Sequence, residues 1–270
     1  MEIGVTLRNM GDQSDPETLL HCARAAEERG FESAWVVDHI AIPPDDAEGS
    51  NGRYLDPLTT LSWLAGATSR IKLGTSVLIL PYRPPLATAK VVATLQELSG
   101  ERLLLGVGVG WMAPEFKALG IPRNERGRRT DETLDFLHRC FADDVMEANG
   151  QPFLFRPRPA RPPILIGGSG PHALARVIAY GDAWLPMPAP LEQLAAAKQA
   201  LGDLAAKAGR PEPSLTLLAR IGSDPDAGAA TLADYRDLGA LRTIASTRYD
   251  DADGYLRWLD GLLKMRERIM

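Results

Sequence analysis

The sequence has few cysteines and no long apolar run. Its 270 residues include two cysteines, Cys22 and Cys140, and neither belongs to a C-x-x-C pair, so a disulfide framework and a zinc ribbon are excluded. No stretch approaches the ~20 consecutive apolar residues of a transmembrane helix, and we expect no membrane span. The opening residues MEIGVTL lack the basic start of a signal peptide, so we expect a cytoplasmic protein.

Positive charge and metal-ligand motifs are also missing. The formal net charge is −5, which argues against a nucleic-acid or anionic-membrane surface. No pair of His or Cys has metal-ligand spacing and H-E-x-x-H is absent, so we expect no metal. Hydrophobic residues make up 45% and charged residues 24%, which excludes disordered, collagen-like and coiled-coil chains. We therefore expect a single domain over residues 1–270 with one large core.

One pattern recurs along the chain: an amphipathic helical stretch ends at glycine, and a short apolar run follows. Gly30, Gly100, Gly181 and Gly239 each mark such a junction. Glycine accepts the left-handed conformation that ends a helix, and nearly continuous apolar runs such as RLLLGVGV are typical of strands buried on both faces.

Eight such strands are predicted, and a helical stretch follows each. Their ranges are 2–8, 33–38, 71–80, 102–109, 163–167, 183–186, 214–221 and 241–246. Eight βα units favour an α/β fold of the (β/α)8 (TIM) barrel type, and an open α/β sheet with some strands misassigned is the alternative.

Two connections exceed ordinary loop length. They span residues 40–57, after strand 2, and residues 111–163, after strand 4, where one helix is predicted at 125–142. Both follow strand carboxyl ends, so we expect insertions over the active site.

In a barrel, function is read from the residues that end the strands. These include Arg8, Asp38, His39, residues 76–82, residues 108–111, residues 167–169 and Arg220. His39 can exchange a proton near neutral pH, and we name it the candidate catalytic residue. A polar pair that satisfies loop backbone groups is the alternative, and Asp38 supports the strand end more naturally than it forms a dyad with His39.

The segment ILIGGSGPHALARV, residues 164–177, resembles a phosphate-binding loop. A strand delivers Gly167, Gly168, Ser169 and Gly170 to the start of a helix, where unpaired backbone N–H groups and the helix dipole attract anions. Ser169 could cap the helix, bind phosphate, or both.

The run GVGVG at 106–110 lacks the spacing of a dinucleotide-binding loop. Its glycines either let a flat ligand approach or form a glycine-rich barrel corner. We find no strong nucleophile, which favours chemistry carried out by a cofactor.

Four segments together resemble the bacterial luciferase-like monooxygenase family, and within it the oxidoreductases that use coenzyme F420. They are RAAEERGFESAWVVDH, IKLGTSVLILPYRPP, LSGERLLLGVGVGW and PPILIGGSGPHALARVIAYGDAWLP. The resemblance implies a barrel with an insertion after strand 4, a cofactor across its mouth, and a cis peptide bond at Ser76–Val77. It implies His39 near the reactive ring. The implied cofactor contacts are Asp38, Ser76, Val77, Gly108, Gly110, Gly167, Gly168 and Ser169, and the implied substrate-pocket residues are Trp111 and Tyr82.

The implied function is hydride transfer between F420 and a small organic substrate. The alternatives are an FMN-dependent monooxygenase that uses reduced flavin and O2, and a non-catalytic flavin-binding barrel. A phosphate-binding isomerase or aldolase would require a catalytic lysine or a metal near a strand end, and the sequence offers no lysine at such a position. The anionic F420 tail could meet cations from the strand 4 insertion: Arg123, Arg126, Arg128 and Arg129.

Two further expectations come from this resemblance. In the sugar-phosphate dehydrogenase branch, an acid acts as proton donor at the place where this chain has Trp111, which argues against sugar-phosphate oxidation. Family members are commonly homodimers, and Trp35, Trp63 and the helix at 57–69 offer apolar surface for an interface.

Overall fold

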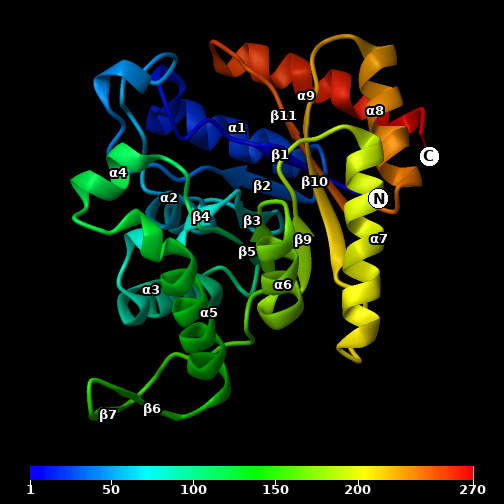
Figure 1. Cartoon of the computed structure of the whole chain (residues 1–270). Helices are drawn as coiled ribbons and strands as arrows, with labels where there is room; N and C mark the ends of the chain where they lie inside the picture. The colour runs from blue at the N-terminus through cyan, green and yellow to red at the C-terminus, as the bar shows by residue number, and fades with distance from the viewer. Residues whose placement is uncertain (270) are drawn as a thin grey trace.

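The computed structural model describes residues 1–269 and forms a closed parallel barrel (Figure 1). The strands are β1 (Glu2–Thr6), β2 (Ser33–Val36), β3 (Lys72–Thr75), β4 (Leu78–Ile79), β5 (Leu103–Gly108), β8 (Ile164–Gly167), β9 (Ala183–Leu185), β10 (Ser214–Arg220) and β11 (Arg242–Ser246). β3 and β4 are two halves of the third barrel strand. β1 pairs with both β2 and β11, and β3 pairs with β5, which closes the ring. The predicted (β/α)8 architecture is confirmed.

A helix follows each barrel strand and covers it from outside. These helices are α1 (Pro16–Glu28), α2 (Pro57–Ala65), α3 (Pro85–Leu98), α5 (Arg126–Ala142), α6 (Pro171–Tyr180), α7 (Leu191–Lys207), α8 (Pro225–Asp237) and α9 (Ala252–Glu267). Proline tolerates the first helical position because that N–H has no helical acceptor. Aspartate caps α1 and α2: Asp15 accepts from Thr18 N–H and Asp56 from Thr59 N–H.

Trp35 fills the barrel interior, and an ion pair lies beneath it. Its ring needs two glycines, because a Cβ at Gly4 or Gly74 would lie 2.5 or 2.3 Å from it. Arg242 lies 5.9 Å from the ring and pairs with Glu32 at 2.6 Å, at the amino end of the strands. Since Trp35 is fully buried, it cannot contribute to a dimer interface as expected, whereas Trp63 is 43% exposed.

The predicted insertion after strand 4 divides into two parts. α4 (Ala113–Ala118) lies beside the carboxyl ends of the strands, before α5. The antiparallel hairpin of β6 (Val145–Ala148) and β7 (Gln151–Leu154) follows α5 and projects from its far end, well away from α4 (Figure 1). A barrel helix runs antiparallel to its strand, so the hairpin lies at the opposite end from the mouth and the expectation that all of 111–163 covers the site is corrected.

The predicted helix at 125–142 is confirmed as α5, which packs between α3 and α6 as the barrel's fourth helix. The connection at 40–57 is irregular apart from a short 3-10 turn at Pro44–Asp46. No helix within residues 1–269 has the length and apolar character needed to cross a membrane.

Candidate active site

Residues at the carboxyl ends of five strands surround a small pocket, here called the mouth pocket. Its volume is about 250 Å³, and its wall combines residues from the ends of β1, β2, β3, β10 and β11. Val37, Ser76 and Leu218 are among the uncharged residues in this wall. An adjoining pocket of about 320 Å³ shares Arg8, Met10 and Arg248 with the mouth pocket. This end of a (β/α)8 barrel is where substrates bind.

His39 follows β2 and is held by a buried carboxylate, Glu115, in the first turn of α4. Nδ1 of His39 lies 2.9 Å from Oε2 of Glu115, whose side chain is fully buried. The Tyr82 hydroxyl donates to the same oxygen at 2.9 Å. The backbone N–H groups of Ile40 and Ala41 donate to Oε1 at 2.6 and 3.0 Å. Four donors therefore converge on one carboxylate.

These donors determine the charge of Glu115 and the position of the proton on His39. Burial alone would raise the pKa of Glu115, but the backbone N–H groups of Ala41 and Ile40, with His39 and Tyr82, outweigh burial and leave this pKa below its usual value. An ionised carboxylate only accepts hydrogen bonds, so Nδ1 must carry a proton. Nε2 of the neutral ring then has a free lone pair and can accept a proton from a substrate.

Two aromatic side chains stand beside the His39 ring. The Tyr54 ring lies edge-on with its centroid 4.9 Å away, and the Trp111 ring lies edge-on at 6.3 Å. Tyr54 also lines the pocket that adjoins the mouth pocket, whereas Trp111 is 64% exposed. Substrate contact by Trp111 stays a prediction, and its position beside His39 is compatible with it.

Asp38 and Tyr82 are buried supports of the site. The Asp38 carboxylate accepts two hydrogen bonds from the Arg83 guanidinium, at 2.6 and 2.9 Å, and one from the Ile79 N–H at 2.8 Å. The Tyr82 hydroxyl is directed at Glu115. These polar groups are occupied within the protein, which gives both residues a supporting position, and contact of Asp38 with cofactor and of Tyr82 with substrate stays a prediction.

The third barrel strand is interrupted by a bulge at Ser76–Val77, and this peptide bond is cis, as the resemblance implied. A Cβ at Gly108 would lie 2.5 Å from a Val77 methyl, and one at Gly167 would lie 2.8 Å from the other. A Cβ at Gly110 would likewise lie 2.8 Å from the Ile79 side chain of β4. The packing of the bulge thus accounts for these glycines, and cofactor contact at Val77 and at the three glycines stays a prediction.

The loop Gly168–Gly170 presents free backbone N–H groups at the start of α6. The φ angles of Gly168 and Gly170 are 108° and 85°, and a Cβ at Gly170 would meet no atom within 4 Å. Among residues 1–269, the N–H groups of Ser169, Gly170 and His172 have no hydrogen-bond acceptor. Ser169 is exposed and does not cap α6, so the capping alternative is excluded. Free N–H groups at the positive end of a helix fit a phosphate group.

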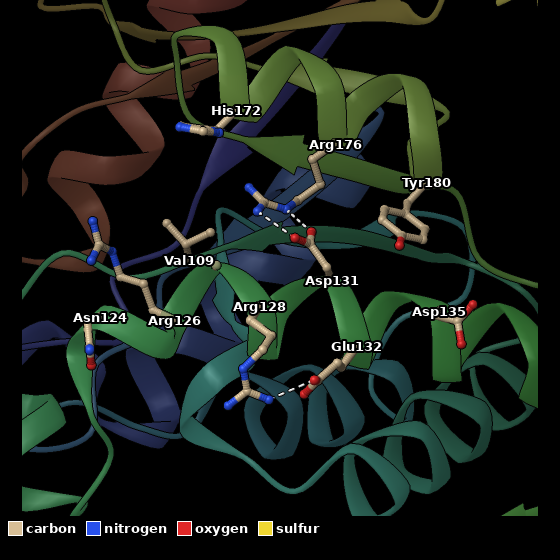
Figure 2. A pocket seen from close by; sticks show the side chains of 11 residues that line it. Val109, Asn124, Arg126, Arg128, Asp131, Glu132, Asp135, His172, Arg176 and Tyr180 are labelled. Carbon is tan, nitrogen blue, oxygen red and sulfur yellow. Dashed lines mark hydrogen bonds and ion pairs between the residues drawn. The ribbon is translucent and has the colours of Figure 1, made fainter.

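A pocket of about 720 Å³ lies between α5 and α6 and includes the exposed His172 (Figure 2). Arg176 pairs with Asp131 across the two helices at 2.6 Å, as dashed lines in Figure 2 show. Arg126, at the start of α5, lines the pocket and donates to a backbone oxygen. The pocket thus brings an arginine close to the same end of α6 that offers free N–H groups.

The four arginines expected to meet an anionic cofactor tail fall into two groups. Arg128 and Arg129 both pair with Glu125, at 2.9 Å each, and so belong to the charged surface of α5. Arg123 and Arg126 form no ion pair within residues 1–269, so these two remain candidates. Residues 1–269 hold no group of three or more His, Cys, Asp or Glu that could bind a metal ion.

Sequence reasoning missed Glu115. A carboxylate does reach His39, but from α4 instead of the strand end where Trp111 stands. The only available signal was an acid in the first turn of a short helix within the insertion, and that pattern is common at helix starts for other reasons.

Comparison with known proteins agrees with this architecture. The model of the family described as luciferase-like monooxygenase matches residues 1–257. The chain belongs to this family. This luciferase-like protein is 32% identical over 181 residues to the uncharacterized protein Rv0940c of Mycobacterium tuberculosis. That match covers 60% of the chain and 62% of the relative, which is less than two thirds of its length.

Solved structures share the luciferase-like barrel at low sequence identity. Monooxygenase RslO1 from Streptomyces bottropensis aligns with a TM-score of 0.81 and 22% identity, over 97% of this chain and 99% of that one. An F420-dependent secondary alcohol dehydrogenase, solved with an F420–acetone adduct, aligns with a TM-score of 0.77 and 17% identity, over 98% and 99%. At these identities the likeness establishes the fold alone.

Proposed function

We propose that this luciferase-like protein is an oxidoreductase that transfers a hydride between coenzyme F420 and a small organic substrate. The observation that carries the proposal is the His39–Glu115 pair at the barrel mouth, with its buried carboxylate 2.9 Å from Nδ1. Hydride transfer at a carbon that bears oxygen needs a proton to leave or join that oxygen, and Nε2 of His39 would exchange it. The alignment with an F420-dependent alcohol dehydrogenase supports the same chemistry.

The residues at the start of α6 fit the phosphate of such a cofactor. The free N–H groups of Ser169, Gly170 and His172 would hold it, and the open backbone at Gly170 leaves room for close approach. Arg126 would face the further negative charges of an F420 tail. When bound, the deazaflavin supplies the hydride acceptor or donor; the protein supplies position and the proton site.

The rival within the family is an FMN-dependent monooxygenase, and the alignment with RslO1 supports it. Titration of the purified protein with F420 and with reduced FMN, followed by fluorescence, separates the two. We expect tighter binding of F420 and turnover that is independent of oxygen. Tighter FMN binding with oxygen-dependent turnover would transfer the protein to the monooxygenase group. Cofactor binding without turnover of any substrate would favour a non-catalytic flavin-binding barrel.

Substitution of His39 tests the proton site. His39→Ala should lower turnover by about 100- to 10,000-fold, the usual contribution of general acid–base catalysis, with little change in F420 affinity. His39→Gln keeps a hydrogen-bonding group without its titration, so partial recovery would assign an orienting role to His39. Parental turnover and pH profile in both variants would make His39 a structural residue.

A further inference from the structure

Three arginines stand around the mouth pocket, and no acid lines it. Arg8 follows β1, Arg220 ends β10, and Arg248 lies just beyond β11. The remaining lining residues are apolar or carry a hydroxyl group. The pocket therefore gathers three positive charges from three separate segments of the chain.

These cations have no anionic partner within residues 1–269. None of the three forms an ion pair, and the exposed side chains of Arg220 and Arg248 have no hydrogen-bond partner there. Arg8 is partly engaged by neutral acceptors, since Nε donates to Gln13 at 3.1 Å and Nη2 to the Gly49 carbonyl at 3.2 Å. Those bonds orient the guanidinium without compensating its charge.

Acidic residues occur next to this group but do not neutralise it. Asp12, Glu48 and Asp250 line the adjoining pocket, and none of them lies within 4.0 Å of a described guanidinium of Arg8 or Arg248. Most other arginines on the helices are paired, as Arg128 and Arg176 show. Like charges repel in a partly enclosed site, so a bound anion would stabilise this arrangement.

We propose that the mouth pocket is an anion subsite that binds the carboxylate or phosphate of the substrate. The inference rests on the proposed function, because it assigns the ligand at this site to the substrate of hydride transfer. A volume of about 250 Å³ suits a small organic anion. The substrate class is therefore a small alcohol or carbonyl compound with an anionic group, which the arginines hold.

The barrel separates this subsite from the predicted phosphate loop of the cofactor. The loop follows β8, the fifth barrel strand, whereas the arginines follow the first, seventh and eighth strands. The two positive sites thus lie on different arcs of the mouth. This arrangement leaves the arginines available to a second molecule when the loop holds the cofactor phosphate.

Probe binding to the purified protein tests the subsite. Benzoate and benzamide have nearly the same shape but differ in charge, and phenyl phosphate distinguishes a phosphate from a carboxylate preference. We expect benzoate or phenyl phosphate to bind at least about tenfold more tightly than benzamide by calorimetry. Arg220→Gln combined with Arg248→Gln should abolish this preference. Arg70→Gln, which removes an exposed charge at the opposite end of the barrel, should leave it unchanged.

Three results would overturn the proposal. The first is equal affinity for benzoate and benzamide in the parent protein, and the second is an equal loss of the preference in the Arg70 control. The third is competition between benzoate and F420 with weaker F420 binding in the double variant, which would assign the arginines to the cofactor. Failure of the parent protein to bind F420 would instead refute the proposed function, and the comparison of benzoate with benzamide would still decide whether the anion subsite exists.

Discussion

Replacement of Glu115 by glutamine is expected to move the proton on His39 to its other nitrogen. In the parent protein, Oε2 of Glu115 accepts from Nδ1 of His39 and from Tyr82, while Oε1 accepts from two backbone N–H groups. Glutamine can keep one oxygen on the backbone donors, and its amide then points an NH2 group at the His39 ring. Nδ1 must accept that bond, so Nε2 carries the proton and loses the lone pair that could accept a proton from a substrate.

The structure gives the expected size of the losses in stability and in turnover. All four hydrogen bonds to this fully buried group become weaker neutral ones and two of them reverse direction, so the free energy of unfolding should fall by about 2 kcal/mol. Turnover in the direction that needs a proton acceptor should fall by about 100- to 10,000-fold, because general base catalysis is lost. F420 affinity should remain close to the parental value, since Glu115 lies under His39 and not at the phosphate loop.

The decisive assay is 15N NMR of the histidine rings, which distinguishes the two tautomers. The chain has four histidines, so subtraction of the His39→Gln spectrum assigns the His39 signals. Glu97→Gln, an exposed carboxylate on α3, is the matched control and should change neither the tautomer nor turnover. If Glu115→Gln keeps the parental tautomer and rate, the reasoning from the carboxylate to the proton position is refuted.

Four other outcomes are expected. Ser169→Asp should weaken binding of F420 and FMN at least about tenfold by calorimetry while Ser169→Asn does not, because an acid at the start of α6 repels phosphate; equal affinities would refute the phosphate loop. Gly108→Ala should lower the melting temperature, since its Cβ would lie 2.5 Å from Val77, and an unchanged melt would contradict that packing. The pKa of Glu32 is about 2, because the Arg242 ion pair outweighs burial. As pH falls from 4.5 to 2, the parent should therefore lose roughly 3 kcal/mol more stability than Glu32→Gln in acid-unfolding curves. Sedimentation at micromolar concentration should give a dimer, with Trp63→Ser weakening it; a monomer would refute the interface.

The barrel could be predicted from the sequence because its signals are local. Each helix–glycine junction and each buried apolar run lies within a single segment, and their order along the chain requires only counting. The boundaries were less predictable. The run at 71–80 is nearly continuously apolar, yet it is interrupted at 76–77, where the bulge packs Val77 against glycines that come from two other strands.

The candidate site was predicted only in part, because it is assembled from distant segments. His39 and the predicted phosphate loop could be singled out because each lies at the end of its own strand. Glu115 lies 76 residues from His39 in sequence, and no spacing rule connects a loop histidine to an acid in an inserted helix. The glycines of β5 and β8 indicate that some group approaches the backbone closely, but a sequence cannot distinguish a packed side chain from a bound ligand as that group.

Those glycines also explain why this part of the mouth departs from ordinary strand composition. Glycine weakens a strand, so two glycines within β5 are a local cost. A Cβ at Gly106 would lie 2.0 Å from the Thr75 carbonyl oxygen, and one at Gly108 would reach Val77. The glycines of β5 therefore allow the third barrel strand to turn inward at its end. That inward turn brings Ser76 into the wall of the mouth pocket, which the three arginines also line. Locally unfavourable residues in a barrel strand therefore indicate where the backbone itself shapes the site.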